Sequence, residues 1–327
     1  MGPKVRHKEL LFPAIRSTTP SFNVPGFGDV KVDSSRILCV PKLMTFPCLK
    51  VLFFKDVSFP STGENYLAGL NGILMGCPLL EELVIIGCDW NGSGLSFCNM
   101  LLRKLTLDLG LGRIREQLND SSIYFNLPSL VYLKFDEALA QGYKIENLHS
   151  VVDAHFEMGF NEDEFGDEQD ICDTMLYLIV GVKNYEFLYL SGLCLRALRR
   201  GYFRLPVFEN LTRLKLEDGC FISGFLLLDF LNRSPRLEVL TLVQGDGRHD
   251  FILGDYPVPS CVSSRLKIIN LEYFKGLRMG IVMVKYFLEN ANLLEQMVIH
   301  QSERNTEREI EILNLPKASE ACSISFK

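Results

Sequence analysis

Few residues in this sequence combine the types and the spacing that chemistry requires. The run Asn161 to Asp173 holds seven carboxylates, which is a density that could attract calcium. A calcium loop needs oxygen ligands at its first, third, fifth and twelfth positions and Gly at its sixth. Phe165 and Cys172 stand at two of the required ligand positions. We therefore interpret the run as a solvated insertion between structural elements.

Two further motifs fall short of a reactive site. Gly110-Leu111-Gly112 lacks the third Gly of a dinucleotide-binding loop and the Gly-Lys-Ser/Thr of a phosphate-binding loop. His155 lies between Asp153 and Glu157, but no second motif supplies a group that would converge on it. No Ser–His–Asp or Cys–His signature is present. We expect a protein that is not an enzyme and that needs no metal and no cofactor.

A cluster of arginines leaves two interpretations open. Arg196, Arg199, Arg200 and Arg204 follow apolar residues that suit a helix, and basic residues favour the end of a helix. The cluster is either a solvated helical face or a site for an anionic partner.

Composition limits the class of protein. The 327 residues include 34 Lys and Arg and 40 Asp and Glu, so the net charge of −6 argues against nucleic acid as a partner. The most apolar run, Met175 to Val182, is far shorter than the ~20 residues of a membrane span. The ten cysteines form no CxxC pair, and no export signal is recognisable. We expect free thiols and a location in the cytoplasm and/or nucleus.

The elements that carry these residues repeat along the chain. A ladder of apolar residues, written apolar-x-x-apolar-x-apolar, recurs ten times. Its first positions are Leu49, Leu80, Leu102, Leu130, Val151, Tyr185, Leu211, Leu237, Leu266 and Leu294. The mean spacing, (294 − 49)/9 or about 27 residues, lies in the range of leucine-rich repeats. Helical patterns occupy 67–74, 171–179, 225–231 and 281–291 between ladders.

These patterns predict an α/β fold, a leucine-rich-repeat solenoid or horseshoe. Strands ~4.8 Å apart on one side and helices ~8–10 Å apart on the other bend a solenoid toward its strands. A curved parallel sheet should line the concave face, with helices or irregular returns on the convex face.

Strand alternation predicts which residues form the concave surface. The second and third ladder positions are apolar in every repeat and should point inward. The residues around them should point outward, and a large concave face suits a protein or peptide partner. Aromatic and basic side chains are typical of interface hot spots. We expect the binding residues to be Phe53, Tyr132, Lys134, Phe187, Tyr189, Arg213 and Lys215.

Several stretches resemble plant F-box/LRR proteins. They are ILMGCPLLEELVIIGCDW at 73–90, YLKFDEALAQGYKIENLHSVVDAHFEMGF at 132–160 and FLNRSPRLEVLTL at 230–242. The segment from VPSCVSSRLKIINLEYFKGLRMGIVMVKYFLENANLLEQMVIH to LPKASEACSISF is similar to the FBD domain of that family. The resemblance covers most of the chain from about residue 37 onward. It implies three parts: a segment 1–45, leucine-rich repeats over 46–257, and an FBD-like domain over 258–327.

The resemblance also implies a function. The family role is a substrate adaptor of a cullin–RING ubiquitin ligase, which docks to a Skp-type adaptor through its F-box. Residues 1–45 carry neither the Leu-Pro start nor the Lys-Arg-Trp-Arg type end of an F-box. The expected role is therefore recognition of an unidentified protein substrate, without the segment that docks to the Skp-type adaptor. The alternative is a binding scaffold with no ligase link, or a truncated product.

Overall fold

The structure is a computed structural model. It describes residues 22–23, 29–33, 44–59, 70–90, 95–108, 122–136, 142–157, 168–182, 184–200, 205–218, 224–244 and 256–327. The chain splits into two compact units. The N-terminal unit contains the described residues up to Val151, and the C-terminal unit contains 152–157 and the described residues from 184 onward. Helix α2 (Glu168–Gly181) is divided between them.

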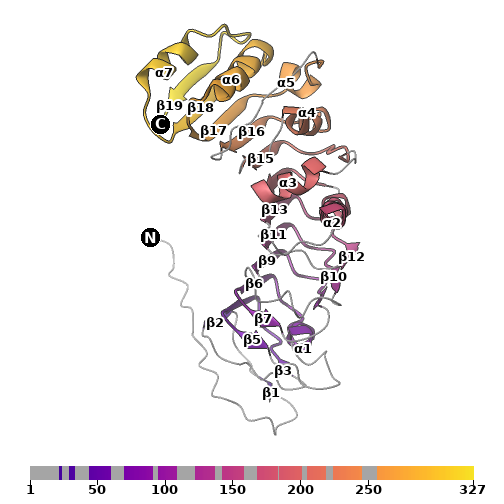
Figure 1. Ribbon diagram of the computed structural model, residues 1–327. Helices are drawn as coiled ribbons and strands as arrows, with labels where there is room; N and C mark the ends of the chain where they lie inside the picture. Colours follow the sequence, from indigo (N-terminus) through magenta and orange to yellow (C-terminus); the bar gives the residue numbers. More distant parts are fainter. Residues whose placement is uncertain are drawn as a thin grey trace. The chain divides into compact units, whose positions relative to one another are not determined.

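Parallel strands form the main sheet of the N-terminal unit (Figure 1). In sheet order these are β2 (Asp29–Asp33), β4 (Val51–Lys55), β6 (Glu82–Ile86), β9 (Lys104–Asp108) and β11 (Tyr132–Asp136). Strands β4, β6, β9 and β11 are the first four predicted ladders. Strand β2 was not predicted, although its Val30 and Val32 pair in register with the ladder residues Leu52 and Phe54 of β4.

The returns of this unit differ from the expectation. A second parallel sheet, β8-β10-β12, is formed by Leu95–Cys98, Ser122–Asn126 and Gly142–Asn147. Asparagine side chains link the ends of its strands, because Asn147 Nδ2 donates to Asn126 Oδ1 at 2.9 Å. Smaller elements are β1 (Phe22–Asn23), β3 (Met44–Thr45), β5 (Ser58–Phe59), β7 (Asp89–Trp90) and α1 (Leu70–Met75).

The C-terminal unit has one parallel sheet whose strands stand in sequence order. They are β13 (Asp153–Glu157), β14 (Phe187–Leu190), β15 (Arg213–Asp218), β16 (Val239–Gln244), β17 (Ile268–Phe274), β18 (Gln296–Gln301) and β19 (Ser323–Phe326). Between the strands run α3 (Gly192–Arg200), α4 (Gly224–Asn232), α5 (Ser260–Ser264), α6 (Arg278–Asn290) and α7 (Thr306–Leu313). Figure 1 shows these helices on one side of the sheet, as the helical patterns predict for α4 and α6.

The core of this unit lies between the sheet and the helices. The inward ladder residues of neighbouring strands stand opposite one another, as in the row Leu214, Leu240, Ile269 and Met297. All four are buried. Burying a side chain of this size contributes about 1.5–3 kcal/mol. The solenoid of leucine-rich repeats is therefore confirmed, with all ten ladders folded as strands.

Two corners need unusual backbone. After β4 and β6, Asp56 and Gly87 adopt φ of 52° and 60°. The φ of Gly87 favours glycine, and a Cβ there would also force the Asp56 carboxylate, whose Oδ1 would lie 2.6 Å away, to turn aside. No helix among the described residues has the length and apolarity needed to cross a membrane.

The first prediction concerns the core. Leu240→Arg should destabilise the protein by several kcal/mol, because Leu240 is 0% exposed and a buried unpaired charge is costly. Thermal denaturation should show a large loss of melting temperature or an insoluble protein. Thr241→Arg, one residue along and on the opposite side of β16, is the matched control and should cost far less, because it loses only one hydrogen bond from Asn270. Equal effects of the two substitutions would show that this register is wrong.

The second prediction concerns the thiols. The seven cysteine side chains that the structure describes are free. Burial raises the pKa of Cys77 to about 12 and that of Cys88 to about 11, whereas Cys48 and Cys98 are exposed. Since the thiolate is the reactive form, iodoacetamide at neutral pH should label Cys48 and Cys98 in the native protein. Mass spectrometry that finds native Cys88 labelled as fast as Cys98 would contradict this.

Candidate protein-binding face

The sheet of the C-terminal unit has a face turned away from its helices, which we call the open face. Its outward side chains form rows across strands, because neighbouring strands pair in register. One row runs Asp153, Phe187 and Arg213, and the next runs His155, Tyr189 and Lys215. Four of the seven predicted binding residues therefore stand side by side on β14 and β15.

Aromatic and cationic side chains alternate within these rows. The Arg213 guanidinium lies 5.1 Å from the centre of the Phe187 ring, and Lys215 Nζ lies 6.0 Å from the centre of the Tyr189 ring. Attraction between a cation and a ring face contributes about 0.5–1 kcal/mol at exposed sites. Phe187 is half-buried and Arg213 is exposed, so both present surface that a partner can contact.

Tyr189 differs from the expectation of an exposed aromatic. It is only 9% exposed, and its hydroxyl donates a hydrogen bond to Glu217 Oε2 on β15. Burial raises the pKa of Tyr189 well above its usual value, and the hydrogen bond to Glu217 raises it further. The hydroxyl therefore stays protonated and serves as a hydrogen-bond donor within the face.

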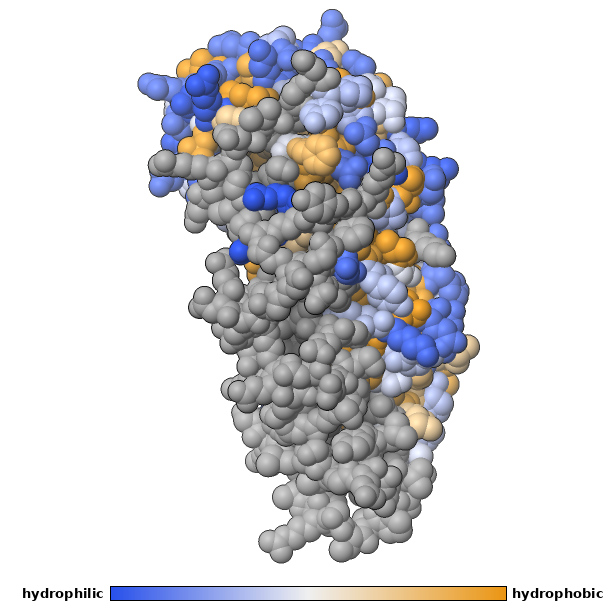
Figure 2. Space-filling view, turned by 45° about the vertical axis from the view of Figure 1, so that its right-hand side comes forward, coloured by the Kyte–Doolittle hydropathy of each residue, from blue (hydrophilic) through white to orange (hydrophobic). Residues whose placement is uncertain are grey.

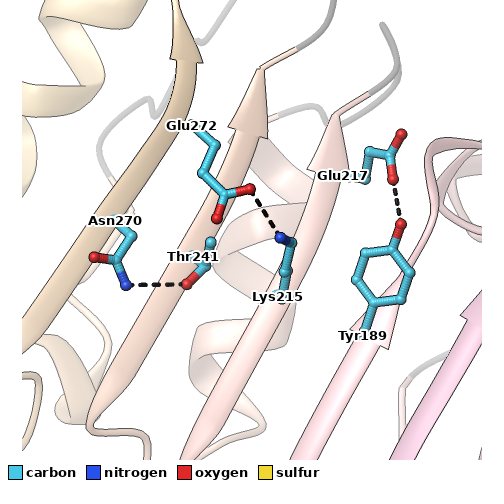
Figure 3. A network of polar contacts seen from close by, with 6 residues as sticks. All are labelled: Tyr189, Lys215, Glu217, Thr241, Asn270 and Glu272. Atoms are coloured by element: carbon cyan, nitrogen blue, oxygen red, sulfur yellow. Dashed lines mark hydrogen bonds and ion pairs between the residues drawn. The ribbon is translucent and has the colours of Figure 1, made fainter. Parts of the chain in front are cut away.

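Polar contacts continue across the neighbouring strands (Figure 3). Lys215 Nζ reaches over β16 to Glu272 Oε2 on β17, at 2.8 Å. Asn270 Nδ2 donates to Thr241 Oγ1 at 3.2 Å. The Lys215 and Glu272 side chains are 32% and 31% exposed, so water weakens this ion pair. Figure 3 shows the six side chains in front of the strands, with helices behind.

His155 and Asp153 complete the edge of the face on β13. His155 Nε2 lies 2.9 Å from Asp153 Oδ1. The imidazole also contacts the Phe187 ring, at 5.0 Å between centres, and the Tyr189 ring, at 5.8 Å. The histidine is thus part of an aromatic cluster. No group of three or more His, Cys, Asp or Glu residues that could hold a metal occurs among the residues the structure describes.

The other three predicted residues belong to the N-terminal unit. Phe53 is half-buried on β4, and Lys31 Nζ lies 5.0 Å from the centre of its ring. Tyr132 and Lys134 are half-buried on β11, separated from β4 in that sheet by β6 and β9. They lie in the same rows as outward residues of β4. Because two strands separate β11 from β4, they do not form one cluster with Phe53.

Other motifs from the sequence fall partly outside the described residues. This applies to Gly110-Leu111-Gly112, to 161–167 of the acidic run, and to Arg204. Arg199 is exposed on α3, on the helical side. Figure 2 shows hydrophilic and hydrophobic side chains interspersed over the coloured surface of its view.

Sequence reasoning missed an exposed aromatic residue at the end of β17. Tyr273 is 64% exposed and has φ of 55°, which is uncommon for a bulky residue. The register with β18 shifts between Leu271 and Phe274, so a bulge turns Tyr273 outward. The ladder ends before this position, and nothing in the spacing signals a bulge.

Comparison with known proteins gives one matching family model, FBD, over residues 256–299. These residues include α5, α6, β17 and the first four residues of β18, so the FBD segment contributes strands that continue the register of β16.

Three similar proteins come from Arabidopsis thaliana. An F-box/LRR-repeat protein is 30% identical over 85% of this chain and 63% of its own length. A second F-box/LRR-repeat protein is 29% identical over 83% of this chain and 55% of its own length. An F-box protein is 30% identical over 88% of this chain and 67% of its own length. The chain thus spans little more than half to two thirds of these relatives.

The third prediction concerns Tyr189 and Glu217. Tyr189→Phe should lower the free energy of unfolding by about 1 kcal/mol, because it removes one hydrogen bond and keeps the ring buried. Once Glu217→Ala has removed the acceptor, Tyr189→Phe should cost measurably less. Urea denaturation of the two single variants and the double variant measures this coupling. Additive losses would mean that the two side chains do not interact in solution.

Proposed function

The chain belongs to the plant F-box/FBD/LRR-repeat family, a family of protein-interaction adaptors, and we propose that it recognises the protein substrate of a cullin–RING ubiquitin ligase. Recognition of the substrate is assigned to the open face of the C-terminal sheet. Docking to the ligase is assigned to an F-box, as the names of the relatives suggest. The open face is the surface that we assign to substrate recognition.

One observation carries the proposed binding face: Phe187 and Arg213 are stacked and accessible above a rigid sheet. Aromatic and Arg side chains dominate the binding energy of protein interfaces when a partner covers them. His155 and Arg213 contact the Phe187 ring from the two neighbouring strands, so the ring is already ordered before binding. Preorganisation lowers the entropy lost on association.

The charges of the face suggest the chemistry of its partner. Arg213 is exposed beside the Phe187 ring, whereas Lys215 is already paired with Glu272. A segment that places an apolar side chain on Phe187 and a carboxylate on Arg213 would satisfy both groups. Long-range attraction to such a segment should weaken as salt concentration rises.

The fourth prediction tests the binding face. Phe187→Ala should weaken capture of the substrate by about 1–2 kcal/mol, or roughly 5- to 30-fold in Kd. Arg199→Ala, on the exposed side of α3, is the matched control and should bind as wild type. Quantitative mass spectrometry of proteins captured from plant extract, followed by affinity measurements with the purified partner, compares the two. Loss of binding in Arg199→Ala with normal binding in Phe187→Ala would reject this face.

The ligase link needs a separate measurement. The chain is fused behind the F-box of the F-box/LRR-repeat relative, and the fusion is tested for co-purification with a Skp-type adaptor and a cullin. Ubiquitination of the captured protein that falls with Phe187→Ala supports a ligase adaptor. A partner that binds through Phe187 but is never ubiquitinated favours a binding scaffold with no ligase link.

A further inference from the structure

The last strand of the C-terminal sheet has one unused edge. Strand β19 pairs with β18, and no strand among the described residues pairs with its other side. Ser323 N–H donates to the carbonyl of Glu295, just before β18, and Lys327 N–H donates to the carbonyl of Ile299 on β18. Backbone groups alternate in direction along a strand, so the N–H and C=O groups of Ile324 and Phe326 point to the unused edge. This edge is a template for another strand.

The core at this edge is also incompletely covered. Met297 and Ile299 on β18 are buried, whereas Ile324 and Phe326, which stand next to them in register, are only half-buried. Helix α7 is the last helix of the unit and packs on α6 (Figure 1). Its Ile310 and Leu313, one turn apart, are 56% and 49% exposed. These apolar side chains are exposed among the charged residues of α7 and are available to a further contact.

We propose that β19 pairs antiparallel with β19 of a second copy of this chain, so that two sheets join across a two-fold axis. In one antiparallel register, two copies of β19 match both in their apolar side chains and in their backbone hydrogen-bonding groups. Ile324 then stands opposite Phe326 of the second copy, and both pairs of outward backbone groups form hydrogen bonds. Opposite residues share a face of the sheet, so these apolar side chains cover one another on the core side.

The same register places Ser325 opposite Ser325 of the second copy, on the two-fold axis. Ser325 Oγ is buried and has no hydrogen-bond partner within the structure. A buried hydroxyl without a partner is unfavourable, and cross-strand serines can bond to one another. Rotation of the Ser325 side chain toward the axis would let the serine of the second copy supply the group that it lacks.

Charge favours this direction of pairing as well. The acidic Glu295 and Glu320 are exposed near the start of β19, and Lys327 is exposed at its end. Antiparallel pairing brings Lys327 beside Ser323 of the second copy, whose backbone is bonded to Glu295. The contact area is small, so the dimer should be weak and depend on concentration.

Sedimentation velocity of the full chain over micromolar to submillimolar concentrations tests the proposal. Wild type should show monomer and dimer and no larger species, because a two-fold contact closes on itself. Ser325→Lys and Ser325→Glu should each raise the dimer Kd about tenfold or more, because they place like charges opposite one another. Mixing the two variants should restore dimers that contain one copy of each.

Ser264→Lys and Ser264→Glu are the controls. They introduce the same charges as the Ser325 variants on the exposed surface of α5 and should dimerise as wild type. Lys327→Glu is a second test at an exposed position, and it should weaken the dimer without disturbing the fold. Circular dichroism checks that each variant is folded. A monomeric wild type at every concentration, or Ser325 variants that dimerise as well as wild type, would overturn the proposal.

Discussion

Side-chain alternation in parallel strands that pair in register is the constraint on which the whole structure depends. Because the period is two, each ladder residue that enters the core fixes its neighbours on the open face. Leu188, Leu214 and Leu240 are buried in one row, and Tyr189, Lys215 and Thr241 form the adjacent row outside. A slip of one residue would exchange core and surface across an entire strand. The same apolar ladder therefore holds the fold together and positions the candidate binding residues.

The open face carries its polar groups in pairs, and this limits what it can bind. Glu217 accepts from Tyr189, and Glu272 is held by Lys215. A partner that engages either carboxylate must first replace an existing contact, which offsets much of the gain. Arg213 is exposed over a half-buried ring and offers accessible surface without such an exchange. Specificity should consequently centre on the Phe187 and Arg213 pair, with the rest of the network acting as a rigid frame.

The sequence predicts most of the sheet and only part of the candidate site. Apolar spacing locates all ten ladder strands, since core residues must recur wherever a strand stacks on the next. The ten predicted ladders leave out β2, although Phe27, Val30 and Val32 have the ladder spacing, and β19, whose ladder begins with the small Ala321. They also leave out β8, β10 and β12, whose spacing differs from the main strands. Alternation places Phe187 and Tyr189 on the same face, but it cannot tell that the Glu217 contact covers Tyr189. The bulge at Tyr273 likewise depends on backbone conformation that no spacing encodes.

The ends of a solenoid are where this constraint is weakest. An interior strand such as β16 is paired on both edges and has helices over its core face, whereas β19 has one paired edge and half-buried core residues. Each repeat is stabilised in large part by its neighbours, so a repeat with a neighbour on one side only has fewer stabilising contacts than an interior one. Ser325 shows this locally, because Asn270 in the same row donates to a neighbouring strand while the Ser325 hydroxyl has no partner. A second strand at β19 would pair its open edge and cover its half-buried apolar residues, and that is the physical reason to expect association at this edge.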